Sequence, residues 1–167
     1  ARDVQTGILR PGSVVDEIKR KVPYRSRLAI IQGFSQSNPA GFLRGLPPSS
    51  PEYTRLMREK MRMERMLANG GWGLTVKARS LKPGDAGGEV VKLRNRLIAM
   101  SFLERTATQT YDAAVQTAVQ RFQQAHGLSV DGKAGSDTMR QLNVSMGNRL
   151  QSVIVAMERE RWINRPR

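Results

Sequence analysis

Few side chains in this sequence could carry out covalent chemistry. Cysteine is absent, which excludes a thiolate nucleophile, a thiolate metal site and a disulfide from these 167 residues. His126 is the only histidine, and it precedes Gly127 at a predicted helix end, where a cation suits the helix dipole. No serine nucleophile pattern, phosphate-binding loop or dinucleotide fingerprint accompanies it. We therefore predict no catalytic residue, no metal ligand and no cofactor.

The stretch 81–143 contains three sets of apolar residues at helical spacing, separated by glycine-rich turns. These sets are Val90, Leu93 and Leu97; Val115, Ala118, Val119 and Phe122; and Met139 and Leu142. Thr110 or Asp112 can start the middle helix, and Gly127 can end it in a left-handed conformation with Leu128 packing back. The stretch is therefore predicted to be a compact three-helix unit in which Phe122 is fully buried.

Two longer helices are predicted on either side of this unit, over 52–68 and 145–162. Ser50 and Pro51 form a typical N-cap and first-turn pair for the first of them. Their apolar faces comprise Tyr53, Leu56, Met63 and Leu67 in the first helix and Met146, Leu150, Val153, Ile154 and Met157 in the second. Because neither helix would be stable alone in water, we expect the two to pack together as a scaffold layer.

Residues 1–45 carry weaker patterns. Val14, Val15 and Ile18 could form one or two helical turns, and the apolar run 28–31 fits either a strand or a buried helix. We predict an all-α chain in which a three-helix unit is inserted in a helical scaffold. The predicted parts are a helical scaffold region over 1–79, the three-helix unit over 80–144, and a scaffold-closing helix over 145–167.

The sequence is strongly basic. Lys and Arg number 28 against 14 Asp and Glu, which gives a formal net charge of +14. Such a charge attracts nucleic acid, anionic lipid or a wall rich in carboxylates and phosphates, although it also fits a merely solvated surface. No run of ~18 apolar residues is present, so no membrane span is expected. The sequence starts at Ala1 without a charged-then-apolar leader, so any signal peptide lies outside it.

The motifs of the central stretch are similar to a known domain. G-D-x-G-G-x-V-V-K-L-R-N-R-L from residue 84, Tyr111, and A-V-Q-R-F-Q-Q-A-H-G-L-S-V-D-G-K-A-G-S-D-T-M-R-Q-L-N from residue 118 resemble the peptidoglycan-binding domain of bacterial cell-wall enzymes. The flanks resemble the long periplasmic L,D-transpeptidases, in which such a domain interrupts a helical scaffold. The flanking segments are residues 7–11, 46–56, 70–72 and the E-R-E-R-W run at 158–162. The resemblance covers nearly the whole chain and is strongest over 46–162.

This resemblance implies a peptidoglycan ligand, a periplasmic or cell-envelope location in a bacterium, and a β-rich catalytic domain as a further partner. That catalytic domain carries a nucleophilic cysteine and a histidine, whereas this sequence has no cysteine and stops where the domain would begin. The chain is therefore expected to be a truncated, non-catalytic half that positions the missing domain on the wall. Whether the truncation is natural or artificial stays open.

A groove between helices with amide, hydroxyl and cationic donors would suit the acidic peptides and N-acetyl sugars of such a wall. The candidate binding residues are Asp85, Arg94, Tyr111, Gln123, Asp131 and Lys133. Each of them also has a structural alternative to ligand binding. Asp85 could serve solely to organise a loop, and Tyr111 could simply be a core residue. Asp131 precedes Gly132 in a typical tight-turn dipeptide, which is a similar alternative.

A helical nucleic-acid-binding module is the alternative function, since three short helices and a large positive charge fit one. Two features argue against it. The connection from Ala99 to Thr110 is about a dozen residues, whereas a helix-turn-helix uses ~3–4. Aromatic residues make up 5% of the chain, which is few for base stacking. We therefore expect no nucleic-acid partner.

Overall fold

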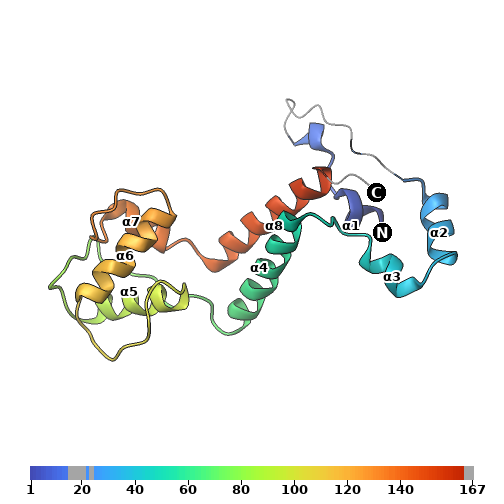
Figure 1. Cartoon of the computed structure of the whole chain (residues 1–167). Helices are drawn as coiled ribbons and strands as arrows, with labels where there is room; N and C mark the ends of the chain where they lie inside the picture. The colour runs from blue at the N-terminus through green and yellow to red at the C-terminus, as the bar shows by residue number, and fades with distance from the viewer. Residues whose placement is uncertain (15–21, 23–24, 164–167) are drawn as a thin grey trace. The chain divides into compact units, whose positions relative to one another are not determined.

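The computed structural model describes residues 1–14, 22 and 25–163. Along the chain the elements are α1 (Arg2–Thr6), the 3₁₀ turn η1 (Pro11–Ser13), α2 (Arg27–Ser35), α3 (Pro39–Arg44), α4 (Pro51–Ala68), α5 (Gly88–Ala99), α6 (Ala113–Ala125), α7 (Ser136–Leu142) and α8 (Met146–Ile163) (Figure 1). The described residues form no strand, only isolated bridges that join Leu81 to Ala134 and Ala86 to Thr110. The predicted all-α class is confirmed.

The chain divides into two compact units. Unit 1 comprises the described residues within Ala1–Arg62 and Leu150–Arg167, and unit 2 comprises Met63–Arg149. The predicted three-helix region 80–144 lies inside unit 2, and its limits as a domain stay a prediction. The helical turns predicted around Val15 and Ile18 lie outside the described residues.

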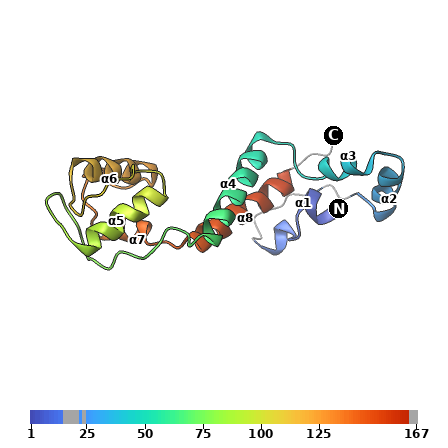
Figure 2. The same cartoon turned by 90° about the horizontal axis from the view of Figure 1, so that it is seen from below.

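In unit 1 the first half of α4 lies beside the last half of α8, as Figures 1 and 2 both show. The Ser50 hydroxyl caps α4 by accepting a hydrogen bond from Tyr53 N at 3.1 Å, and it donates to Glu160 of α8 at 3.0 Å. Arg161 donates to the Tyr53 hydroxyl at 2.9 Å, with its guanidinium 5.4 Å from the centre of the Tyr53 ring. The pairing expected from the apolar faces of the two helices is therefore present in this unit.

The N-terminal segment packs on the end of α8. Glu158 is only 8% exposed, and one oxygen of its carboxylate accepts hydrogen bonds from Ile8 N at 2.6 Å and Leu9 N at 2.8 Å. Gly7 has a φ of +87°, and a Cβ atom there would lie 2.5 Å from the same Glu158 oxygen. Only glycine fits this close approach. Two segments that carry the family resemblance, near Gly7 and near Glu158, are thus in direct contact.

Glu158→Ala is expected to destabilise this contact by about 2 kcal/mol, because the Ile8 and Leu9 amides lose a charged acceptor. Hydrogen exchange of these two amides measures the effect directly and should become faster. Glu52→Ala serves as the control, because Glu52 makes only an exposed ion pair with Arg55 and its removal should change little. Unchanged exchange at Ile8 and Leu9 would show that Glu158 does not hold the segment.

Unit 2 is built around α5, α6 and α7. Its core comprises Val76, Leu81, Val90, Leu93, Leu97, Tyr111, Val115, Ala118, Val119, Phe122, Ala134, Met139 and Leu142. Phe122 is 1% exposed, which confirms its predicted burial, and its ring packs edge-on against Phe102 and in a stack with His126 at 4.0 Å. The core therefore centres on the middle helix.

The limits of α6 follow the signals in the sequence. Asp112 Oδ1 accepts a hydrogen bond from Val115 N at 2.9 Å, so Asp112 is the N-cap, one of the two starts that the sequence allows. Gly127 has a φ of +65°, and Leu128 N donates to Gln123 O at 2.9 Å. This is the glycine-dependent helix ending expected from the sequence, and Leu128 packs against the core as predicted.

Two apolar residues predicted to be buried are exposed instead. Leu67 of α4 is 45% exposed. Ile154 of α8 is 42% exposed. The undecided run 28–31 is helical and forms part of α2, with Leu28 and Ile31 exposed. Within the described ranges, no helix is both long and apolar enough to span a bilayer.

Candidate functional site

The predicted binding residues belong to hydrogen-bond networks in unit 2, the first of which centres on Arg94. This guanidinium projects from α5 and is 2% exposed. Its Nη1 donates to Thr110 O and to Asp112 Oδ2, both at 2.9 Å, and its Nη2 donates to Thr106 Oγ1. A single buried cation therefore fixes the loop between α5 and α6 and also orients the residue that caps α6.

The second network joins Tyr111 to Gln123. The Tyr111 hydroxyl donates to Gly132 O at 3.0 Å, and Gly132 N donates to Gln123 Oε1 at 3.0 Å. Gln123 Nε2 donates to Asp131 Oδ1 at 2.8 Å and to Lys133 O at 2.9 Å. Burial raises the pKa of Tyr111 well above its ordinary value, so its phenol stays a neutral donor. The turn at 131–133 is thus held against α6.

The remaining candidates have more access to solvent. Asp85 is half-buried, and its Oδ2 accepts a hydrogen bond from Lys82 N at 2.8 Å. Asp131 and Lys133 are exposed. Hydrogen bonds from Lys133 N and then from the Gln123 amide hold the pKa of Asp131 below its usual value, so this carboxylate is charged at neutral pH. A carboxylate and an ammonium are therefore available to a ligand at this turn.

Only some of the predicted residues share a pocket. Gln123, Asp131 and Lys133 line a small pocket of about 160 Å³, whereas Asp85, Arg94 and Tyr111 do not line it. This volume is below the ~300–1,000 Å³ typical of small-molecule sites. It could hold one substituent of a larger ligand. Contact of the six residues with a ligand stays a prediction.

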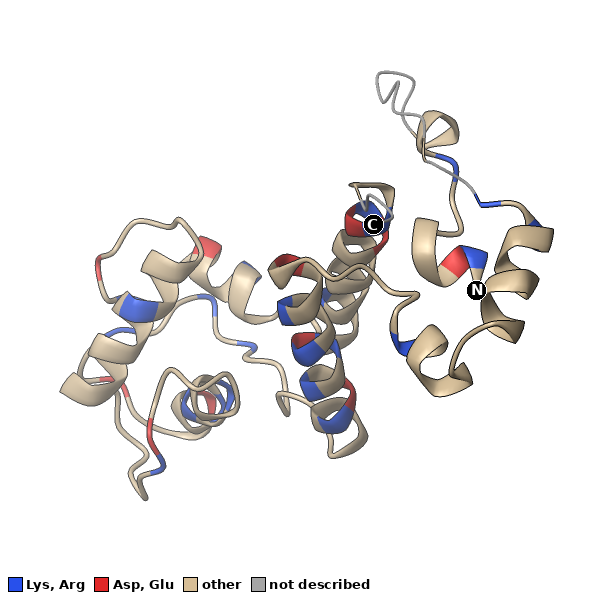
Figure 3. Cartoon of the chain, turned by 45° about the vertical axis from the view of Figure 1, so that its right-hand side comes forward, with Lys and Arg blue, Asp and Glu red and all other residues tan. Residues whose placement is uncertain are grey.

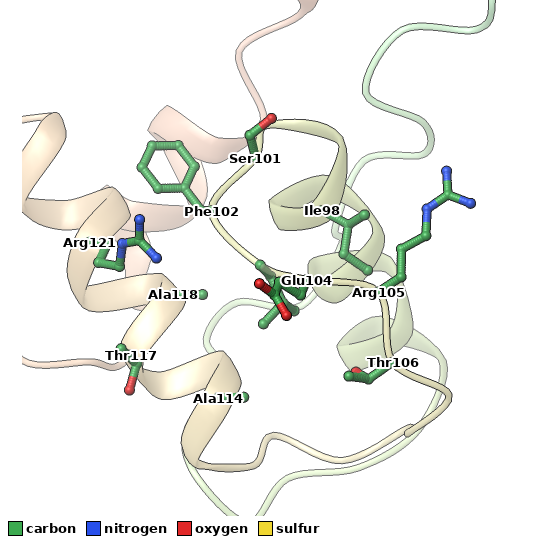
Figure 4. A pocket seen from close by; sticks show the side chains of 11 residues that line it. Ile98, Ser101, Phe102, Glu104, Arg105, Thr106, Ala114, Thr117, Ala118 and Arg121 are labelled. Atoms are coloured by element: carbon green, nitrogen blue, oxygen red, sulfur yellow. The ribbon is translucent and has the colours of Figure 1, made fainter.

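A larger groove lies where sequence reasoning placed no site. It measures about 770 Å³ and is formed by the end of α5, the loop 101–106 and one face of α6 (Figure 4). Its lining comprises Ile98, Ser101, Phe102, Leu103, Glu104, Arg105, Thr106, Ala114, Thr117, Ala118 and Arg121. None of the six predicted residues lines it, although Arg94 holds its wall through Thr106.

One signal in the sequence could have indicated this groove. Ala114 and Ala118 are one helical turn apart, and Arg121 follows on the same face of α6. The small side chains of Ala114 and Ala118 leave room for a ligand next to the Arg121 cation. Helical spacing predicts Ala118 as a core residue only, and Ala118 is indeed 2% exposed.

The part of the chain that the structure describes holds no group of three His, Cys, Asp or Glu side chains that could bind a metal ion. His126 stacks on Phe122, and its Nδ1 lies 2.8 Å from Phe122 O. This packing agrees with the structural role predicted for the histidine at the end of α6.

Unit 2 thus contains three short helices, loops anchored by hydrogen bonds, and pockets lined by polar side chains. The sequence profile of the peptidoglycan binding domain family matches residues 86–142, roughly a third of the chain. The match spans α5, α6 and α7. No curated protein matches the chain. The chain therefore contains a peptidoglycan-binding domain, which supports a peptidoglycan-binding role and implies a cell-wall or envelope context.

Proposed function

We propose that this chain is the peptidoglycan-binding and scaffold portion of a periplasmic, cell-wall L,D-transpeptidase, and that it positions a catalytic domain on the wall. The observation that carries the proposal is the peptidoglycan-binding domain at 86–142. The contact between Glu158 and the amides of Ile8 and Leu9 supports the scaffold part. It joins two segments whose sequences resemble that enzyme family.

The role proposed for the chain itself is binding and placement. Transpeptidation through a thioester needs a thiolate, and this chain contains no cysteine. The covalent step would therefore belong to the catalytic domain. Anchoring that domain on the wall raises its effective concentration near its substrate to the order of mM, even when the anchor binds weakly. Weak binding would also let the enzyme move along the wall.

Electrostatic attraction would contribute to wall binding. The chain has a net charge of +14, and Figure 3 shows Lys and Arg in both units. On α4, however, acidic residues alternate with the basic ones, and Glu52 and Glu59 form ion pairs with Arg55 and Arg62. Part of the charge is therefore compensated locally. Asp85, Asp131 and Lys133 would contact the wall directly. Buried Tyr111 and Gln123 would hold the turn at 131–133, and buried Arg94 would hold the loop between α5 and α6.

Sedimentation with purified sacculi tests the proposal. The chain is expected to bind sacculi at 0.1 M salt and to bind less at 1 M, because the Debye length falls from ~10 Å to ~3 Å. Lys133→Ala should weaken binding about two- to five-fold, since one exposed cation is lost. Arg27→Ala, which removes an exposed cation from α2 in unit 1, is the matched control. Absence of sedimentation at every salt concentration would refute wall binding.

The same preparation tests the other parts of the proposal. The pure chain should release no muropeptides and form no new cross-links, and either product would contradict the non-catalytic role. Duplex DNA added as a competitor should leave sacculus binding unchanged at 0.15 M salt. Displacement from sacculi by DNA, with tighter binding to the DNA, would instead support the nucleic-acid-binding alternative.

A further inference from the structure

The groove of about 770 Å³ in unit 2 has an apolar floor of small residues. Its volume lies within the ~300–1,000 Å³ typical of ligand sites. Ala114 and Ala118 line the α6 side, where larger side chains would fill the hollow (Figure 4). Phe102 and Ile98 add apolar surface from the opposite side. This floor suits small apolar substituents such as methyl groups.

Charges of both signs stand at the edges of the groove. Arg121 projects from α6, and Glu104 and Arg105 come from the loop across from it (Figure 4). All three are exposed, and none has an ion-pair or hydrogen-bond partner for its side chain among the described residues. Elsewhere in the described chain, Arg and acidic side chains three residues apart do pair with one another. The groove therefore offers a free cation on α6 and a free anion on the loop to one ligand, while the Arg105 side chain extends away from Ala114 and Ala118 (Figure 4).

The loop that carries two of these charges is held firmly. Phe102 N and Leu103 N both donate to Leu97 O, at 2.8 Å and 3.3 Å. Ser101 has a φ of +65°, which reverses the chain directly after α5, and Arg94 donates to Thr106 at the far end of the loop. A ligand would therefore meet a preorganised wall, which lowers the entropy cost of binding.

We propose that this groove binds the stem peptide of peptidoglycan. Arg121 takes a carboxylate of the peptide, Glu104 takes its free ammonium group, and the floor of Ala114 and Ala118 takes alanine methyl groups. This inference rests on the proposed wall-binding function for the choice of polymer. It goes beyond that function by assigning the site and by choosing peptide over glycan. A neutral sugar strand would make no use of the charges of Arg121 and Glu104, whereas the peptide offers each of them a group of opposite charge.

Titration of the isotope-labelled full chain with the tetrapeptide L-Ala-γ-D-Glu-meso-diaminopimelate-D-Ala tests the site by NMR. Amide shifts are expected in 101–106 and 114–121, whereas N-acetylglucosamine tetramer should not shift them. Arg121→Gln should weaken the peptide affinity about 5- to 10-fold and Glu104→Gln about 3-fold, as exposed charged contacts are lost. The matched controls Arg27→Gln and Glu52→Gln change the same charges in unit 1 and should leave the affinity unchanged.

The outcomes separate this inference from the proposed function. If the wild-type chain binds sacculi but the tetrapeptide shifts no groove amide, the groove inference is wrong and the wall-binding function remains. The same conclusion follows if the sugar tetramer, rather than the peptide, shifts the groove. If the tetrapeptide binds with the expected loss in Arg121→Gln while sacculi do not bind the chain, the groove inference stands and the wall-binding function fails.

Discussion

Phe122→Ala is expected to lower the free energy of unfolding of unit 2 by about 3–5 kcal/mol. The ring is 1% exposed, lies among the core residues of all three helices and contacts both Phe102 and His126. Its removal loses apolar burial and leaves a cavity that the rigid neighbours fill only in part. Because small domains are stable by only ~5–15 kcal/mol, this one change could unfold much of unit 2.

Denaturant unfolding followed by hydrogen exchange of the α6 amides measures this loss within unit 2. Phe122→Leu keeps most of the volume and should cost about 1–1.5 kcal/mol. Val130→Ala shortens a side chain that is 53% exposed, and it serves as the control with little expected effect. A loss for Phe122→Ala as small as that of the control would show that the ring is not central to the core.

The helices of unit 2 could be predicted from the sequence because their signals are local. The start of α6 at Asp112 and its end before Gly127 each depend on residues within one or two turns of the helix end. The burial of Phe122 can be predicted from the helical spacing of the apolar residues alone. Predictions from such local patterns are correct here because the apolar helix face that the sequence indicates is the face that packs in the core.

The roles of the polar candidates do not follow from the sequence, because their hydrogen-bond partners lie in other segments of the chain. Gln123 bonds to a turn that follows α6, and Arg94 bonds to a loop that follows α5. A polar residue in a family-like motif can contact a ligand or hold a loop, and the sequence pattern is the same in both cases. Burial separates the two roles, and it depends on tertiary packing. Glu104 lies outside the family-like motifs, and nothing in the motif that contains Arg121 marks this residue as a ligand contact, so the groove can be recognised only from the fold.

The role of Arg96 could not be predicted from the sequence either, because a charged residue on a surface helix is normally solvated. Here it is 3% exposed. Its Nε and Nη2 donate to Leu142 O at 3.1 Å and 2.6 Å, and its Nη1 donates to Gly73 O at 3.1 Å. Leu142 O is one of the last carbonyls of α7, which have no partner within that helix. Arg96 therefore ties the end of α7 to the segment that leads into the three-helix unit.

A second contact reinforces the tie. The Asn143 side chain accepts a hydrogen bond from Val76 N at 3.0 Å and donates to Val76 O at 2.8 Å. Together, Arg96 and Asn143 hold the chain segments before α5 and after α7 next to each other. Burial lowers the pKa of the Arg96 guanidinium from its high ordinary value, yet an arginine remains charged at neutral pH.

Arg96→Met is therefore expected to cost about 3 kcal/mol, because buried carbonyls lose charged donors while the apolar stem is retained. Hydrogen exchange of the Val76 amide should become faster, since its segment loses the neighbouring tie. Arg96→Lys should have an intermediate effect, because a single ammonium cannot reproduce the forked contacts of a guanidinium. Arg79→Met removes an exposed arginine from the same incoming segment and should change stability little. Equal stability of Arg96→Met and Arg79→Met would mean that solvent replaces the guanidinium without cost and that the tie does not stabilise unit 2.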